Sequence, residues 1–324
     1  MNQPITLIIP HQNQRNALVS LLETIAKWTL LPDEIIIIDS SYQDLECDEN
    51  FKIFCNQNNI SLKIIQEKYI FPGHARNLGV QCAKNDLIAF LDAQTVPTKL
   101  WLQATFEQYN SSKAIFVRGA TLYAGETFKE KIMIATTYGF KALKTLPGSL
   151  IHKEVFFKCG LFIDNVRAGE DGDWMSRSYL HKVPIVEGAE KITYIGLRNI
   201  SFKGIIKKWY RNYKHTHHLP FFQKHKELYF YLVSILLILA AQNWNWIAVA
   251  IAGGDVFIPH ITKIMVLSIF MLYFFIRAIL LPIKKGAISY LVNPIFLISV
   301  FFLSIFLDFV KIIAFANTAI KNKP

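Results

Sequence analysis

The uneven distribution of apolar residues along the chain constrains its fold more than any other feature. Residues 228–324 contain long apolar runs with seven Lys/Arg and two Asp/Glu, whereas residues 1–227 alternate short apolar and polar blocks. Three runs, at 228–252, 262–283 and 288–316, each approach or exceed the roughly 20 residues that a helix needs to cross a bilayer. The sequence therefore predicts about three transmembrane helices behind a folded head.

A strongly basic segment joins the head to these apolar runs. Between Arg198 and Lys226 there are eight Lys/Arg and no acid. Within residues 201–227, Ile205, Trp209 and Tyr213 can fall on one helical face, which is typical of an amphipathic helix lying in the membrane interface. Basic residues next to apolar spans are expected to contact anionic membrane lipids.

The location of the head follows from the same charges and from its N-terminus. The first residues have no basic region followed by a long apolar run, so no signal peptide is predicted. Lysines flank the apolar runs in the pattern of the positive-inside rule. We expect a multi-pass protein of the inner membrane with a cytoplasmic head, and the side on which the C-terminus lies stays open.

The first half of the head alternates strand-like and helix-like patterns. Short apolar runs at 5–10, 34–39, 61–66 and 86–92 are separated by segments whose apolar residues recur at helical spacing. Uninterrupted apolar strands that alternate with helices predict an α/β fold with a mostly parallel sheet covered on both faces.

Several candidate site residues stand at the predicted strand ends. Pro10, Asp39 and Asp92 each close an apolar run, and ligands of such sheets bind beyond the carboxyl ends of the strands. A further acidic group, GEDGDW, occupies residues 169–174. Any one of these acids could be an ordinary helix cap or loop residue. Their order along a sheet of this kind suits a nucleotide-sugar, whose base, diphosphate and attacking hydroxyl need separate partners.

A set of motifs, taken in order, resembles a known family. The matching segments are LIIPHQNQ (7–14), IIIIDSS (35–41), GHARNLGVQCAKNDLIAFLDAQTVPTKLWL (73–102), GSLIHKEVFFKCGLFID (148–164) and GEDGDWMSRS (169–178). Together they resemble a family 2 glycosyltransferase with the GT-A fold. The resemblance implies inverting transfer of a sugar from a nucleoside diphosphate to a hydroxyl. The expected divisions are a GT-A domain at 1–200, the basic helix at 201–227 and the transmembrane region at 228–324.

The resemblance also implies roles for the strand-end residues in holding the donor. The Pro10 loop and Asp39 would hold the base and ribose of the nucleotide. Arg76 would contact the donor, since a guanidinium suits the geometry of a diphosphate. Asp92 would lie at the metal and the diphosphate.

The acidic group after Gly169 would carry the catalysis. Asp171 is expected to be the general base, which must reach the attacking hydroxyl by a hydrogen bond. Asp173 is the alternative base, and Glu170 would orient the loop. Trp174 is expected either on the acceptor side, stacked on a sugar face, or packed in the core. Arg177 lies one helical turn beyond Asp173 and would pair with it.

The metal site is where this chain departs from the family pattern. Asp92 and Gln94 are the expected metal ligands, but the family usually has a second acid where Gln94 stands. Hard cations such as Mg²⁺ and Mn²⁺ prefer anionic oxygens, although an amide oxygen can also coordinate. The loss of one anionic ligand is therefore expected to weaken metal binding without abolishing it, since the donor diphosphate supplies further oxygens.

Three hypotheses for the function follow. The first is a membrane-anchored, inverting transferase that moves one sugar to a hydroxyl of a lipid-linked or membrane-associated glycan. The second is a polyprenyl-phosphate sugar synthase, whose phosphate acceptor needs no strong base. The third is a non-catalytic membrane partner that retains the GT-A fold. No nucleic-acid partner is expected, because the basic charge adjoins the apolar spans and no module for single strands is recognisable.

Overall fold

The computed structural model describes residues 3–216 and 259–321, together with positions 219, 235, 239, 243, 246 and 250 between them. The chain divides into two compact units. The first comprises Met1–Glu126, Lys141–Ile200 and His218–Phe222, and the second comprises Thr127–Phe140, Ser201–His217 and Gln223–Pro324. A short segment from the middle of the head thus belongs to the same unit as the apolar C-terminal part.

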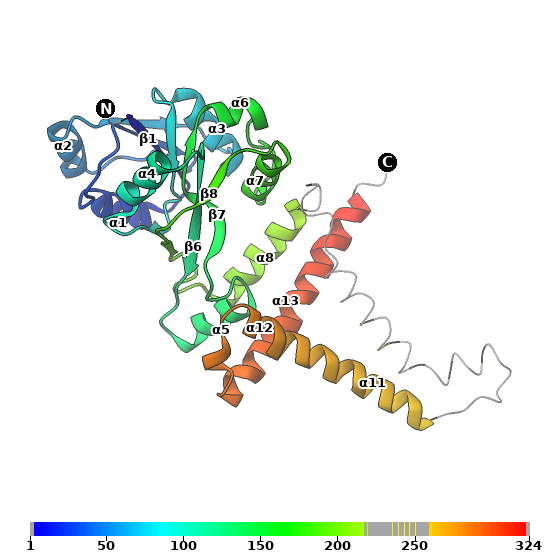
Figure 1. Cartoon of the computed structure of the whole chain (residues 1–324). Coiled ribbons are helices and arrows are strands. Elements are labelled where there is room, and N and C mark those ends of the chain that lie inside the picture. The colour runs from blue at the N-terminus through cyan, green and yellow to red at the C-terminus, as the bar shows by residue number, and fades with distance from the viewer. Residues whose placement is uncertain are drawn as a thin grey trace. The chain divides into compact units, whose positions relative to one another are not determined.

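Figure 1 colours the chain from blue at the N-terminus to red at the C-terminus and labels many of its elements. The strands are β1 (Ile5–His11), β2 (Glu34–Asp39), β3 (Ser61–Gln66), β4 (Leu87–Phe90), β5 (Thr95–Val96), β6 (Phe116–Tyr123), β7 (Leu143–His152), β8 (Ile185–Glu187) and β9 (Ile192–Tyr194). The helices of the first unit are α1 (Arg15–Ile25), α2 (Glu49–Gln57), α3 (Pro72–Cys82), α4 (Trp101–Ser111), α6 (Glu154–Cys159) and α7 (Glu170–Leu180). Those of the second are α5 (Phe128–Thr136), α8 (Phe202–Thr216), α11 (Pro259–Phe274), the π-helix η1 (Phe275–Leu280), α12 (Leu281–Lys284), the short η2 (Ile288–Tyr290) and α13 (Pro294–Lys321).

The strands β1, β2 and β4 in the parallel half of the sheet are predominantly apolar and buried, because helices cover both faces of the sheet. On β2, Ile35 and Ile37 point into one core, which includes residues of α1, α2 and α4. Ile36 and Ile38 point into a second core, which includes residues of α3, α6 and α7. Successive residues of a strand face opposite sides, so the unbroken isoleucine run is the pattern that two buried faces require.

The sheet is mixed rather than uniformly parallel. Its order is β3-β2-β1-β4-β7-β6-β9-β5, with β8 paired to β6. The four strands from β3 to β4 are parallel, as the sequence predicts, but β7 runs antiparallel to both β4 and β6, and β5 is antiparallel to β9. The prediction of a mostly parallel sheet thus describes one half of it. The other half is made by β5 to β9, where β6 runs antiparallel to β7 but parallel to β8 and β9.

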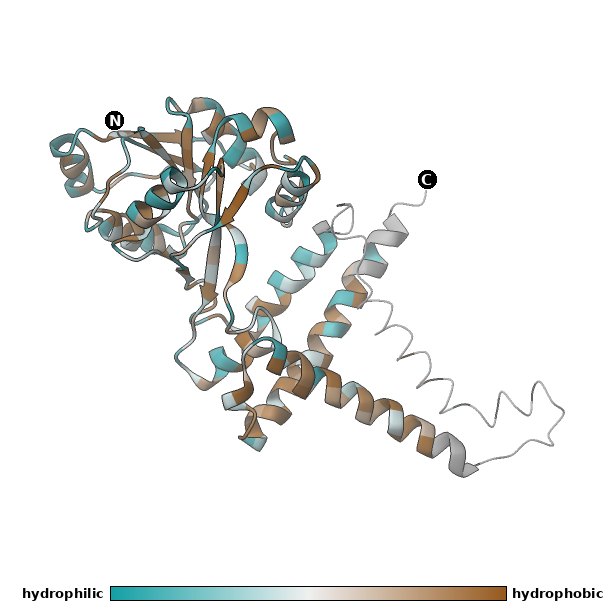
Figure 2. Ribbon diagram, viewed as in Figure 1, coloured by the Kyte–Doolittle hydropathy of each residue, from teal (hydrophilic) through white to brown (hydrophobic). Residues whose placement is uncertain are grey.

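The second unit contains two apolar stretches long enough to cross a membrane. They are Ile264–Lys284 and Pro294–Ala314, with mean hydropathies of 2.5 and 2.4. Only 11% of the first is buried within the chain, unlike the core helix of a soluble protein. Figure 2 shows α11 and most of α13 as predominantly hydrophobic. The predicted first span, at 228–252, falls almost entirely outside the described residues.

Helix α8 uses part of its apolar face for packing inside the second unit. Ile205 and Trp209 are buried, and the Trp209 ring lies edge-on to Tyr138 with centroids 5.4 Å apart. Farther along α8, the ring of Tyr213 lies under the ammonium group of Lys311 from α13. The amphipathic pattern of residues 202–216 therefore reflects contacts within the protein, and a position in the membrane interface stays a prediction.

A buried ionic cluster joins η1 to α13 in the same unit. The Nε and Nη2 atoms of Arg277 lie 2.8 Å from the two carboxylate oxygens of Asp308. Tyr273 donates to the same carboxylate at 2.7 Å, and the Nζ of Lys311 lies 3.2 Å from it. Each charged partner is less than a tenth exposed. Buried charges are tolerated in apolar surroundings when they are paired in this way.

Candidate functional site

The predicted strand-end residues do lie at one edge of the parallel half of the sheet. His11 pairs in register with Asp39 at the ends of β1 and β2. Phe90 is the last residue of β4 and pairs with Ile8 of β1, so Asp92 follows directly beyond the same edge. Parallel strands end together, and side chains far apart in sequence meet there.

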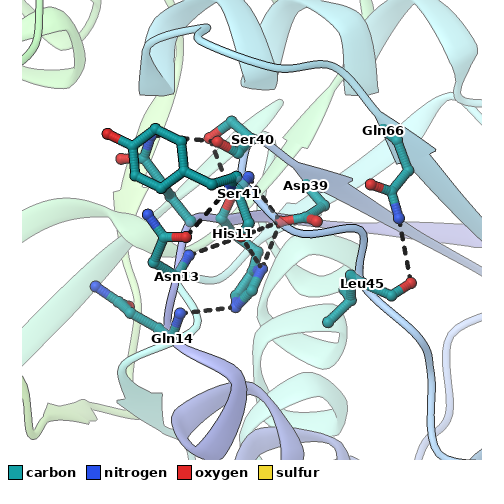
Figure 3. Close-up of polar contacts among 10 residues, drawn as sticks. His11, Asn13, Gln14, Asp39, Ser40, Ser41, Leu45 and Gln66 are labelled. Carbon is teal, nitrogen blue, oxygen red and sulfur yellow. Dashed lines mark hydrogen bonds and ion pairs between the residues drawn. The ribbon is translucent and has the colours of Figure 1, made fainter.

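Asp39 is held by a polar cluster that includes His11 (Figure 3). Its Oδ1 lies 2.7 Å from His11 Nδ1 and accepts from the Ser41 hydroxyl at 2.6 Å. Ser41 Oγ in turn accepts the backbone N–H of Asn13 at 2.7 Å. The loop after β1 is thereby tied to the loop after β2, and Asp39 is almost completely buried.

The hydrogen bonds of His11 identify which ring nitrogen carries the proton. Its Nε2 accepts the backbone N–H of Gln14 at 3.1 Å, so a neutral ring has its proton on Nδ1 and donates to Asp39. Among the described residues, no group donates to the other carboxylate oxygen, Asp39 Oδ2, although it is buried. A buried acceptor left without a donor needs an explanation, and a ligand that donates to it is one.

The second group of site residues centres on Arg76. Its Nη1 donates to Glu170 at 2.6 Å and its Nη2 donates to Asp92 at 3.0 Å. Arg76 and Glu170 are buried, whereas a third of the Asp92 side chain is exposed. The guanidinium thus bridges the loop after β4 and the start of α7. Both Nη groups therefore donate to carboxylates of the protein. Arg76 mainly contacts the acids of the site, and it is not directed into an open pocket for the donor.

The charges of this group shift one another's pKa values. Burial disfavours the charged guanidinium, but Asp92, Glu170 and Asp171 together raise the pKa of Arg76 above its ordinary value. Burial raises the pKa of Glu170, and the neighbouring Arg76 partly offsets that shift. Three carboxylates therefore surround one guanidinium, and the site is acidic.

Helix α7 presents the acidic group because of how it begins. Gly169 precedes it with φ of 90°, a left-handed conformation that favours glycine. Glu170, Asp171 and Asp173 then fall in the first turn, where the helix dipole stabilises negative charge. Asp173 is buried and pairs with Arg177 at 3.0 Å, as the sequence predicts. Asp171 is partly exposed, and its Oδ1 accepts the backbone N–H of Gly172.

Trp174 does not lie on the acceptor side. Its side chain is fully buried, packs against Phe156 and Phe162, and donates its indole N–H to the Gly160 carbonyl at 2.8 Å. No face of the ring is left for a sugar. Of the two interpretations of Trp174, core packing is the one that the structure supports, because residue 174 falls on the side of α7 that meets the sheet.

Gln94 is fixed by Tyr194 on β9, the strand that pairs with β5 directly after Gln94. Tyr194 donates its hydroxyl to Gln94 Oε1 at 2.9 Å. A Cβ at residue 196 would collide with both of these oxygens, so Gly196 is needed for the pair to form. The amide oxygen can still coordinate a cation with its second lone pair.

A metal ion would find one carboxylate and one amide at this loop. Within the described ranges, no three His, Cys, Asp or Glu side chains are grouped closely enough to hold a metal by themselves. The part-exposed Asp92 fits Mg²⁺ or Mn²⁺ as one ligand, because hard cations take carboxylate oxygens and often complete their coordination with a substrate phosphate.

Sequence reasoning missed three residues that shape the site. His11 follows Pro10 at a strand end, so its pairing with Asp39 was open to prediction from parallel register. Arg167 donates to the side chain of Gln12 and joins the loops before α7 and after β1. Tyr194 lies 100 residues beyond Gln94. The sequence around Arg167 or Tyr194 does not indicate a role in the site, because each residue meets its partner only in the folded chain.

The geometry agrees with what a family comparison finds. Residues 6–163, which include β1 to α6 and the strand ends described above, match Glycosyl transferase family 2. This segment is a family 2 glycosyltransferase domain. Its mixed α/β fold fits the GT-A type that the sequence resemblance implies.

Individual relatives resemble parts of the chain. A protein of Rickettsia felis, named as an uncharacterized glycosyltransferase, is 28% identical over 183 residues, which are 52% of this chain and 29% of the relative. The O-antigen chain rhamnosyltransferase RfbN of Salmonella typhimurium is 34% identical over 93 residues, 28% of each chain. A solved structure, the mannosyltransferase PcManGT of Pyrobaculum calidifontis with GDP-Man and Mn²⁺, has a TM-score of 0.49 and 15% identity, covering 94% of this chain and 88% of that one. The chain spans less than a third of the length of the Rickettsia relative.

Proposed function

We propose that this protein is a membrane-anchored, inverting glycosyltransferase. It moves one sugar from a nucleoside-diphosphate-sugar to a hydroxyl of a lipid-linked or membrane-associated glycan, with its family 2 domain in the cytoplasm. The observation that carries the proposal is the arrangement at the start of α7. Glu170 is bound to Arg76 and Asp173 is bound to Arg177, which leaves Asp171 as the part-exposed carboxylate of the three.

The chemistry assigned to Asp171 is that of a general base. The acceptor oxygen attacks the anomeric carbon, its proton passes to the Asp171 carboxylate, and the bond to the nucleoside diphosphate breaks on the opposite side. Asp173 suits this role less well, because it is buried and already ion-paired. Asp39 holds the nucleoside through its buried Oδ2, which can accept an N–H or O–H from the ligand.

The acidity of the site supports a role for a divalent cation. A diphosphate that approaches Asp92, Glu170 and Asp171 meets three carboxylates and one guanidinium. Bound Mg²⁺ or Mn²⁺ would neutralise the charge that develops on the leaving diphosphate. Asp92 is the residue that would hold it, with Gln94 beside it as a neutral neighbour. Arg76 keeps Asp92 in place and positions it for this task.

Membrane anchoring rests on the two long apolar stretches of the second unit. They suit helices that cross a bilayer, and the basic helix α8 suits contact with anionic lipids. A protein held in this way meets acceptors that are themselves lipid-bound. The alternative acceptor, a polyprenyl phosphate, would use the same anchoring and the same donor site.

The test compares purified wild-type protein with Asp171→Asn across several nucleotide-sugars. Transfer to a hydroxyl acceptor is expected to fall by about 10²- to 10⁴-fold, the usual contribution of a general base, while the Kd of the nucleoside diphosphate changes little. Glu23→Gln, which neutralises an exposed acid on α1, is the control. Wild-type rates for Asp171→Asn with a hydroxyl acceptor would reject the base assignment. Near-normal rates only with polyprenyl phosphate would favour the synthase.

A further inference from the structure

The second unit contains an apolar groove that neither the donor site nor the catalytic acids use. It has a volume of about 490 Å³ and lies between α13 on one side and α5 with the first residue of α8 on the other. Apart from Lys129 and Ser299 its lining is apolar, and it includes Phe128, Phe202, Phe302 and Phe306. This volume is within the usual range for sites that bind small molecules.

Several aromatic rings of the groove remain exposed after packing. Phe302 is 64% exposed, and Phe128 and Phe202 are each 48% exposed. Phe202 and Phe306 contact each other with centroids 5.1 Å apart, so these two rings form one apolar surface across α8 and α13. Contiguous exposed apolar surface of this kind marks a site for an apolar partner.

The position of the groove on α13 indicates the medium that surrounds it. Ser299, Phe302 and Phe306 fall within Pro294–Ala314, one of the two stretches that suit a membrane-crossing helix. If α13 spans the bilayer, as the proposed function requires, the groove opens to hydrocarbon rather than to water. A lipid chain is the apolar partner available there.

Charge around the groove selects the kind of lipid. Lys129 is part of the lining, and α8 carries Lys203 and Lys207 near its start and has no acid. On α5 the one acid, Glu130, is engaged in a capping box with Thr127. An apolar groove flanked by cations complements a molecule with a hydrocarbon chain and an anionic head group.

We infer that this groove binds the hydrocarbon chain of the lipid-linked acceptor. The inference rests on the proposed function, since it assumes an acceptor with a lipid chain and an anionic head. It adds a named site for that chain. Bulk membrane lipid, a segment of this same chain and a second copy of the protein are the competing occupants.

Photo-crosslinking separates these occupants without any need for turnover. The full-length protein carrying Phe302→p-benzoylphenylalanine is mixed in detergent with a labelled polyprenyl monophosphate and irradiated. The label is expected on the protein, and excess unlabelled polyprenyl monophosphate, but not phosphatidylglycerol, should suppress it. The control is the same replacement at Phe309, which lies on α13 and is similarly exposed but does not line the groove.

Four outcomes would overturn the inference. Equal labelling at positions 302 and 309, or equal competition by phosphatidylglycerol, would show nonspecific contact with lipid. A cross-link from position 302 to residues 228–252 would show that a segment of the polypeptide itself occupies the groove. A cross-linked dimer would show that a second copy occupies it.

A second variant tests whether the groove matters for transfer. Ser299→Trp should fill the groove and raise the KM for a polyprenyl-linked acceptor by about tenfold, roughly the effect of losing two buried methylene contacts, with donor affinity unchanged. Ile298→Trp adds the same ring at the neighbouring position, which is half exposed and outside the groove, and should leave KM unchanged. Equal KM values in the two variants would contradict the inference. Specific labelling at position 302 without any sugar transfer would instead refute the proposed function alone.

Discussion

Each unit of this protein contains a buried arginine that binds a carboxylate, and the two clusters differ in their balance of charge. In the first unit, Arg76 bridges Asp92 and Glu170, with Asp171 nearby. In the second unit, Asp308 is shared by Arg277 and Lys311. Acids exceed bases in the first cluster, and the reverse holds among the described residues of the second.

Exposure separates the two clusters further. A third of the Asp92 side chain remains exposed, whereas Arg277 and Asp308 are each only 4% exposed. A cluster with an accessible carboxylate and surplus negative charge can still take up a cation and a ligand. A closed cluster mainly fixes the helices that contribute to it. We therefore expect the Arg76 cluster to bind a ligand and the Arg277 cluster to stabilise the fold, and the variants below test that contrast.

The largest expected effect comes from removing the shared carboxylate of the closed cluster. Asp308→Asn leaves Arg277 and Lys311 facing a neutral amide, and breaking a buried ion pair in this way costs about 3–5 kcal/mol. The melting temperature in detergent should fall markedly, while the Kd of the nucleoside diphosphate stays unchanged. Asp92→Asn is the matched variant, and it should lose donor binding with a smaller loss of stability. If Asp308→Asn melts at the wild-type temperature, the Arg277 cluster does not have the structural role expected of it.

Replacing each arginine by lysine keeps the charge and removes the planar fork. Arg76→Lys should lower the transfer rate by about 10- to 100-fold, because a charged hydrogen bond contributes roughly 1.5–3 kcal/mol. Arg277→Lys should lower the melting temperature and leave the rate of the folded protein unchanged. Rates and melting curves measured on the same preparations test both. If both variants lower only the transfer rate, or both lower only the melting temperature, the two clusters do not have the different roles expected here.

Adding a carboxylate to the open cluster should strengthen its cation site. Gln94→Asp restores an anionic oxygen beside Asp92, and we expect Mn²⁺ to bind about tenfold more tightly in the presence of a nucleoside diphosphate. Titration calorimetry measures this directly. Gln57→Asp, an exposed change on α2, controls for overall charge. An unchanged Mn²⁺ affinity would mean that residue 94 lies outside the coordination sphere.

The smallest expected effects come from the two tyrosine hydroxyls. Tyr273→Phe removes a bond to Asp308 and should destabilise the protein by about 1 kcal/mol, the usual net value of one hydrogen bond. Tyr194→Phe releases Gln94, and it should change the affinity for Mn²⁺ and donor a few-fold with little change in melting temperature. A stability loss confined to Tyr194→Phe would contradict the assignment of roles.

Much of the first unit was predictable from local sequence. The strand predicted at residues 34–39 coincides with β2, because buried parallel strands have a strong local signature. Asp39 and Asp92 were also predictable as site candidates, because parallel strands end together at one edge of a sheet. The order and direction of β6, β7 and β9, which pair with each other both parallel and antiparallel, have no such local signature, because they depend on which distant segments pair.

The amino-acid sequence by itself determined the alternation of strands and helices, the edge of the sheet where Asp39 and Asp92 lie, and two of the apolar stretches. Tertiary structure alone decided which acids are engaged. It paired Glu170 with Arg76 across 94 residues, buried Trp174 in the core, and fixed Gln94 with Tyr194. Periodicity and strand ends are local properties of the backbone, whereas ion pairing and burial depend on distances that exist only once the chain has folded.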